Sequence, residues 1–244
     1  MAATRRLSGV KTWALYYGTT RPAGLQAYDL AVVAPEGWDK PSVAALKSRG
    51  TVAMAYLPVL EQQKRAGSPA PSNVLVVDGK PMEQPLWHTW VLDPRHELTE
   101  ERVLHMAEAL VAQGFDGFFL DTVGDVENVR LLPARLRFLL VPAAARIVAA
   151  LRHRYPDRPI IQNWGLGALL DLTQQHIDGV CWEDFPTGYP DAWQEQLALR
   201  LSALADQGLK VFALNQQPSE TPPPLATRLG FCWYGAPSSY TLWR

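Results

Sequence analysis

Two segments of this 244-residue chain share one pattern: an apolar residue, Asp-Gly, three apolar residues and then a carboxylate. They are residues 115–121, which end at Asp121, and residues 177–183, which end at Glu183. Asp-Gly is a turn signal, and the apolar run predicts a strand buried on both faces. Because burying an unpaired carboxylate costs at least several kcal/mol, a carboxylate at such a strand end needs a partner or a chemical role. We therefore predict that Asp121 and Glu183 converge on one site.

The elements that position these residues are short apolar runs alternating with helical patterns. Helices are predicted over 41–49, 99–114, 134–154 with a kink or split at Pro142, 165–175 and 192–207. Eight strands with helices in most gaps predict a single (β/α)8 barrel over residues 1–244. The eight predicted strands are 13–18, 30–34, 52–57, 117–121, 159–163, 179–183, 210–215 and 230–235.

One stretch interrupts this alternation. Residues 61–98 follow the third strand and form an insertion, which in a compact domain is usually a lid or a binding loop. Inside it, residues 74–80 predict a short hairpin around Asp78-Gly79, and residues 88–93 predict an extra strand.

The composition is typical of a globular protein, with 48% hydrophobic and 19% charged residues. The 23 Lys and Arg residues nearly balance the 24 Asp and Glu residues, so nothing indicates binding to nucleic acid or to a membrane surface. No apolar run approaches the roughly 18 residues of a membrane span. The basic N-terminus lacks the apolar core of a leader, so the chain as given is expected in the cytoplasm, or outside the cell if a leader was removed. We expect a monomer.

Several motifs, in this order, resemble the endo-α-1,4-polygalactosaminidase-like glycoside hydrolases. The resemblance covers residues 13–183 and implies a barrel enzyme that cleaves α-1,4-linked, galactosamine-containing polysaccharide without a cofactor. It departs from the family where Asp125 follows Asp121 by four positions instead of three, and where Trp164-Gly165 replaces Gly-Gly. The motifs are Tyr16-Tyr-Gly18, Tyr28-Asp-Leu-Ala-Val-Val33, Ala55-Tyr-Leu-Pro-Val-Leu-Glu61, Gly114-Phe-Asp-Gly-Phe-Phe-Leu-Asp121, Ile160-Ile-Gln-Asn163 and the strand ending in Glu183.

The resemblance gives Asp121 and Glu183 as the catalytic pair, and we expect endo cleavage with retention. Asp121 is then the nucleophile and Glu183 the acid/base. Carboxyl groups roughly 5 Å apart indicate retention, whereas roughly 6.5–9.5 Å indicates inversion. The competing interpretation is structural, because a strand-end carboxylate also caps helices or pairs with arginine.

Further residues are expected to bind the amino-sugar polymer. Asn163 ends the strand between the two carboxylates, although Asn is as common in turns. Tyr17 and Tyr56 end strands and could line the floor, although strand tyrosines more often pack in cores. Four acids expected in loops at the carboxyl ends of the strands would attract ammonium groups, although ordinary solvated loop charge explains them equally well: Glu61, Asp93, Asp125 and Asp184. Trp164 and Trp233 are expected to stack on sugar faces, with core packing as the alternative.

The sequence shows no metal-ligand spacing among its five histidines and two cysteines, and no phosphate-binding glycine loop. Cys181 and Cys232 are expected to be buried free thiols, with a disulfide as the alternative. Two rival functions stay open. One is a catalytically silent barrel that binds polysaccharide, and the other is a barrel enzyme acting on a small molecule in a closed pocket.

Overall fold

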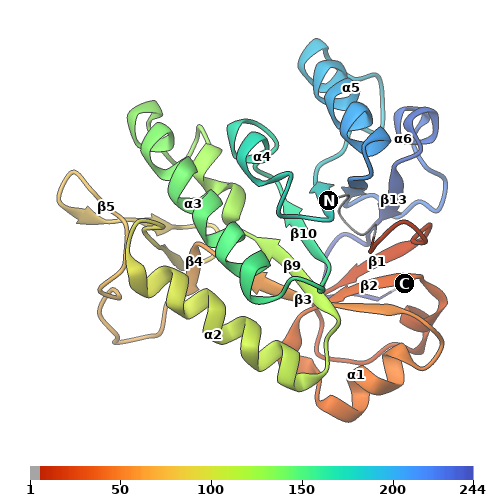
Figure 1. Cartoon of the computed structure of the whole chain (residues 1–244), viewed down its shortest axis with the longest axis horizontal. Coiled ribbons are helices and arrows are strands. Elements are labelled where there is room, and N and C mark those ends of the chain that lie inside the picture. The colour runs from red at the N-terminus through yellow and green to blue at the C-terminus, as the bar shows by residue number, and fades with distance from the viewer. Residues whose placement is uncertain (1–5, 244) are drawn as a thin grey trace.

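Eight parallel strands form a nearly closed barrel with helices outside it (Figure 1). The computed structural model describes residues 6–243. Each strand pairs with the next barrel strand along the chain, so the predicted (β/α)8 barrel is confirmed, with every strand within two residues of its expected bounds. The strands are β1 (Trp13–Tyr16), β2 (Leu30–Val33), β3 (Val52–Pro58), β9 (Gly117–Asp121), β10 (Ile160–Asn163), β11 (Gly179–Trp182), β12 (Lys210–Asn215) and β13 (Cys232–Gly235).

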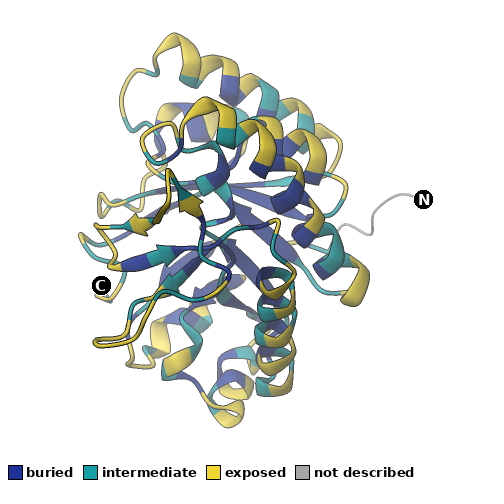
Figure 2. Ribbon diagram, turned by 90° about the vertical axis from the view of Figure 1, so that its left-hand side faces the viewer, coloured by how far each residue is buried: buried dark blue, intermediate teal, exposed yellow. Residues whose placement is uncertain are grey.

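The barrel strands are apolar on both faces because inward side chains fill the barrel and outward side chains meet the helices. All four residues of β1, β2 and β10 are buried. Figure 2 shows the central strands in dark blue, whereas the helices are yellow mainly on their outer surfaces. One hydrophobic cluster extends from Leu7 to Ala236, so the whole described chain shares a core.

Short capping motifs fix where the helices begin and end. The side chains of Asp39 and Asp191 each accept a hydrogen bond from a backbone N–H three residues on. In return, the backbone N–H of each aspartate donates to the side chain of that third residue. Gly114 ends its helix with a left-handed φ of 102°. The helices are α1 (Lys40–Lys47), α2 (Glu97–Gln113), α3 (Ala134–Arg154), α4 (Ala168–Thr173), α5 (Ala192–Asp206) and α6 (Pro224–Leu229), with 3-10 turns at η1 (Ala23–Ala27), η2 (Pro35–Gly37) and η3 (Val123–Glu127).

Several helices differ from the sequence prediction. Helix α4, predicted over 165–175, spans only Ala168–Thr173. Helix α2 begins at Glu97, two residues early, because the ring nitrogen of His96 accepts the Leu98 N–H while Thr99 is buried and bonds to the Asp93 carbonyl. Helix α3 continues through Pro142 without a break. Helix α6 was not anticipated, since its proline at the start is a helix signal that the surrounding proline-rich stretch obscured.

The insertion between β3 and α2 contains two small antiparallel sheets, on the left of Figure 1. Strands β5 (Val76–Val77) and β6 (Lys80–Pro81) form the predicted hairpin, and Asp78 and Gly79 have the two positive φ values, 49° and 77°, that a two-residue turn requires. The other sheet joins β4 (Glu61–Gln63), β8 (Thr89–Val91) and β7 (Glu83–Gln84), so the predicted extra strand is also present. A lid role for the insertion stays a prediction.

The barrel seam lies between β1 and β13, the two ends of the strand order. The Trp13 indole N–H donates to the Cys232 carbonyl at 2.9 Å across this seam, and the Trp13 ring packs against Tyr234. Cys181 and Cys232 are both buried free thiols, as expected. No helix within residues 6–243 is long and apolar enough to span a bilayer.

Candidate active site

Three neighbouring strands deliver three polar side chains to the same point at their carboxyl ends. Asp121 ends β9, Asn163 ends β10, and Glu183 directly follows β11. The Asn163 amide nitrogen donates to Asp121 Oδ1 at 2.8 Å and to Glu183 Oε2 at 3.0 Å. The two accepting oxygens therefore lie no farther apart than the sum of those distances, 5.8 Å. Residues 62 positions apart in sequence converge because β9 and β11 both pair with β10.

Phenol groups complete the hydrogen bonding of both carboxylates. The Tyr240 hydroxyl donates to Glu183 Oε1 at 2.6 Å, and the Tyr56 hydroxyl is hydrogen-bonded to Asp121. Tyr17 lies between these two phenols, with its ring 4.8 Å from the Tyr56 ring and 5.7 Å from the Tyr240 ring. Each carboxylate thus has one tyrosine of its own and shares the Asn163 amide.

The electrostatics of this cluster favour a protonated Glu183 and neutral phenols. Burial raises the pKa of Glu183, the hydrogen bonds from Asn163 and Tyr240 oppose the rise, and the Asp121 charge adds to it. Burial, followed by the nearby carboxylates, raises the pKa of Tyr17, Tyr56 and Tyr240, so all three remain hydrogen-bond donors at neutral pH. Within residues 6–243, no Lys, Arg or His side chain pairs with Asp121 or Glu183.

The residue after each of the three polar side chains has left-handed backbone geometry. Thr122, Trp164 and Asp184 have φ values of 62°, 55° and 56°. This conformation is uncommon outside glycine and is an outlier for a β-branched threonine. The Thr122 hydroxyl accepts the Leu60 N–H at 2.9 Å, which ties the turn after Asp121 to the start of the insertion. Strained turns at three adjacent strand ends are a frequent sign of a functional site.

Searches with the amino-acid sequence find no matching family model and no matching curated protein. Solved structures do match. The glycoside hydrolase domain of PelA from Pseudomonas aeruginosa superimposes with a TM-score of 0.79 at 25% identity, over 96% of this chain and 97% of that one. Ega3 of Aspergillus fumigatus, in complex with galactosamine, gives a TM-score of 0.67 at 14% identity, covering 94% and 92% of the chains. The chain resembles the endo-α-1,4-polygalactosaminidase-like glycoside hydrolases.

A more distant match shares the barrel alone. An α-galactosidase from Thermus thermophilus superimposes with a TM-score of 0.61 at 16% identity, over 96% of this chain but 59% of the other. PelA and Ega3 match this chain over nearly their whole length, so its lean barrel is close to theirs in size as well as in topology.

Two further predicted residues, Glu61 and Asp125, form a carboxyl pair beside Asp121. Glu61 is 6% exposed, accepts the Thr89 hydroxyl at 2.7 Å and is hydrogen-bonded to Asp125. One Asp125 oxygen is buried without a partner. Burial and the Glu61 charge raise the pKa of Asp125 well above its ordinary value, and burial raises that of Glu61. Each member of the pair therefore binds a proton more readily than an isolated carboxylate does, and a role for the pair in binding the sugar stays a prediction.

Of the remaining predicted residues, Asp93 and Trp233 are held by other groups, whereas Asp184 and Trp164 adjoin the central cluster. Asp93 forms an ion pair with Arg95 at 2.7 Å, which outweighs burial and lowers its pKa. The Trp233 indole donates to the Ser219 carbonyl, and its ring packs edge-on against Phe185. Asp184 is exposed and Trp164 half-buried, both next to the central cluster.

Tyr240 is the residue of this cluster that sequence reasoning missed. It follows the last strand by five positions and carries no motif, so neither periodicity nor strand ends pointed to it. A weak signal existed, because the C-terminal stretch keeps Tyr240 and Trp243 among small and polar residues.

Among residues 6–243, no group of three or more His, Cys, Asp or Glu side chains is arranged to hold a metal ion.

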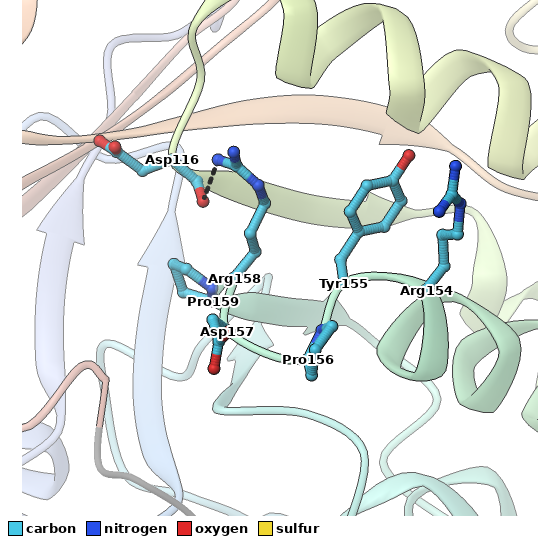
Figure 3. Close-up of a pocket in the computed structure, with 7 residues that line it drawn as sticks. All are labelled: Asp116, Arg154, Tyr155, Pro156, Asp157, Arg158 and Pro159. Carbon is cyan, nitrogen blue, oxygen red and sulfur yellow. Dashed lines mark hydrogen bonds between the residues drawn. The ribbon is translucent and has the colours of Figure 1, made fainter.

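A cavity of about 460 Å³ lies at the opposite end of the strands (Figure 3). Arg158 points from it to the carbonyls of Phe115 and Asp116, and Tyr155 packs against Phe118. The amino ends of barrel strands usually serve stability, whereas barrel active sites form at the carboxyl ends. We therefore place the candidate active site at Asp121, Asn163 and Glu183, away from this cavity.

Proposed function

We propose that this protein is a glycoside hydrolase that cleaves α-1,4-linked, galactosamine-containing polysaccharide, acting within the chain. The observation that carries the proposal is the bridge from Asn163 to Asp121 and Glu183, which holds two carboxyl groups beside each other at the carboxyl ends of the strands. Paired carboxyl groups at this spacing match the requirement of glycoside hydrolysis. The neighbours PelA and Ega3 support the substrate class, since one is a glycoside hydrolase domain and the other binds galactosamine.

The separation favours a retaining reaction. An upper bound of 5.8 Å between the bonded oxygens lies below the roughly 6.5–9.5 Å that inverting enzymes need for an intervening water. In the first step, the Asp121 carboxylate attacks the anomeric carbon while protonated Glu183 gives its proton to the leaving oxygen. The bond to the leaving sugar breaks as the bond to Asp121 forms, which produces a covalent glycosyl-enzyme.

The second step reverses the role of Glu183. Because the Asp121 charge contributes to the raised pKa of Glu183, esterification of Asp121 removes that contribution and the pKa falls. Glu183 then loses its proton and acts as the base that deprotonates water. Water attacks the anomeric carbon, the sugar–Asp121 bond breaks, and the product keeps the starting configuration. Asn163 stays bonded to both carboxyl groups throughout.

The charge at the mouth suits a cationic polymer. The exposed Asp184 carboxylate adjoins Glu183, and Asp121 faces only neutral donors within the described residues. An ammonium-bearing sugar would be attracted to this uncompensated negative charge.

The direct test is release of reducing ends from partially deacetylated α-1,4-galactosamine polymer, with product sizes followed over time. We expect wild type to release internal fragments and both Asp121→Asn and Glu183→Gln to release none above background. Asp93→Asn is the matched control, because this acid is already paired with Arg95 and should keep wild-type activity. Binding of the polymer without cleavage would instead support the silent polysaccharide-binding barrel. Cleavage with inverted anomeric product would overturn the retaining step.

A further inference from the structure

The last residues of the chain are bound across the barrel seam. The Tyr17 N–H donates to the Tyr240 carbonyl at 2.7 Å, and the Trp243 ring packs edge-on against Tyr16 with centroids 5.7 Å apart. At Gly18 a Cβ would lie 2.6 Å from the Thr241 carbonyl, so the backbone there leaves no room for a side chain.

This anchoring brings one side chain back to the catalytic cluster. We propose that Tyr240 is a positioning residue: residues 236–243 are bound across the seam so that its hydroxyl holds the Glu183 carboxyl group, a role that rests on the acid/base function proposed for Glu183. Tyr240 and Asn163 occupy one Glu183 oxygen each, at 2.6 and 3.0 Å. The carboxyl group is therefore fixed from two sides, by β10 and by the end of the chain.

The same hydrogen bond also governs when Glu183 loses its proton. A donor to a carboxylate favours the charged form, so Tyr240 partly offsets the pKa rise that burial causes at Glu183. Removing the hydroxyl should raise that pKa further. The other groups that face Glu183 are Asp121 on β9, Cys181 on β11, Asp184 after β11, Tyr17 after β1 and the neutral amide of Asn163 on β10.

The first test measures Glu183 directly and needs no substrate. Protein labelled with ¹³C at the glutamate side-chain carboxyl is titrated by NMR, and the Glu183 signal is assigned by its loss in Glu183→Gln. In Tyr240→Phe we expect the Glu183 midpoint to rise by about one pH unit, the effect of losing one hydrogen bond to a charged group. Tyr56→Phe is the matched control, since it removes an equivalent hydroxyl from Asp121, and it should leave the Glu183 midpoint unchanged.

The second test follows kcat and KM for the galactosamine polymer across pH. Tyr240→Phe should shift the high-pH limb of the kcat/KM profile to a pH about one unit higher. It should also lower kcat about tenfold, with KM nearly unchanged. An unchanged Glu183 midpoint, or the same shift in Tyr56→Phe, would overturn the inference. If the midpoint moves but wild type cleaves no polymer, the positioning role holds and the proposed substrate is wrong.

Discussion

Strands β9 and β11 each have an acidic residue at both ends, and the partners of those acids differ between the amino and the carboxyl ends. At the amino ends, Asp116 pairs with Lys47 at 2.6 Å, and Asp178 pairs with Arg6 at 2.7 Å and Arg152 at 2.5 Å. At the carboxyl ends, Asp121 and Glu183 receive only neutral amide and phenol donors within the described residues.

The backbone differs between the two ends in the same way. Gly117 and Gly179 follow the paired aspartates because a Cβ there would lie 2.2 Å from the Pro159 carbonyl and 2.9 Å from the Lys210 carbonyl. At the mouth, non-glycine residues adopt left-handed geometry instead. Ion pairs and close packing stabilise the amino ends of these strands. The carboxyl ends keep acids without ion-pair partners and strained turns, both of which are typical of functional sites.

Substitution of the mouth carboxyl groups should have the largest effect on activity. Asp121→Asn and Glu183→Gln are each expected to lower kcat about 10³-fold or more, because each removes a reacting group. Neither should lower the free energy of unfolding in urea, since neither carboxylate is held in an ion pair. A stability loss as large as the one expected below at Asp178 would remove the distinction between the two ends.

Substitution at the amino end should have the largest effect on stability. Asp178 is buried and also accepts the Ile160 N–H at 2.9 Å, so Asp178→Ala removes the one carboxylate that Arg6 and Arg152 both contact. We expect a loss of about 3–5 kcal/mol in unfolding free energy. At a temperature where the variant is folded, kcat should stay within a few-fold of wild type. Abolished activity in a folded variant would show that the two ends are coupled.

Substitution within the Glu61–Asp125 pair should have a smaller effect on stability, and one that depends on pH. It compares this buried carboxyl pair with Asp121 and Glu183 at the same end of the barrel. Since the folded protein raises the pKa of Asp125, it binds a proton that the unfolded chain releases, and stability falls as pH rises above the unfolded value. Asp125→Asn mimics the protonated form. We expect it to gain about 1 kcal/mol over wild type at pH 7, to converge with wild type near pH 4, and to keep activity. Equal effects at both pH values would mean that folding does not raise the pKa of Asp125.

The smallest expected effect tests the strain. Asp184 is exposed with φ of 56°, so Asp184→Gly and Asp184→Ala both remove the charge but only glycine relieves the backbone. In matched denaturant titrations, the free energy of unfolding of the glycine variant should be about 1 kcal/mol higher than that of the alanine variant. Equal stabilities would show that the turn after Glu183 is not strained.

Local patterns were enough to predict the barrel, because its strands are short apolar runs and most of the gaps between them carry helical patterns. The hairpin at Asp78-Gly79 was predicted for the same reason, since two positive φ values require those residue types. The spacing of Asp121, Asn163 and Glu183 at three strand ends also followed from the sequence once parallel pairing was assumed.

Contacts between distant segments decided the rest. The sequence does not show that Asp178 is paired with arginine while Glu183 is held by an amide, because the two acids simply flank the same apolar run, residues 179–182. Nor does it show that Glu61 and Asp125 share a buried site, or that Tyr240 returns to Glu183 from the end of the chain. Local sequence determines which residues stand at strand ends, but burial and partners set their charge, and those depend on which strands the closed barrel makes neighbours.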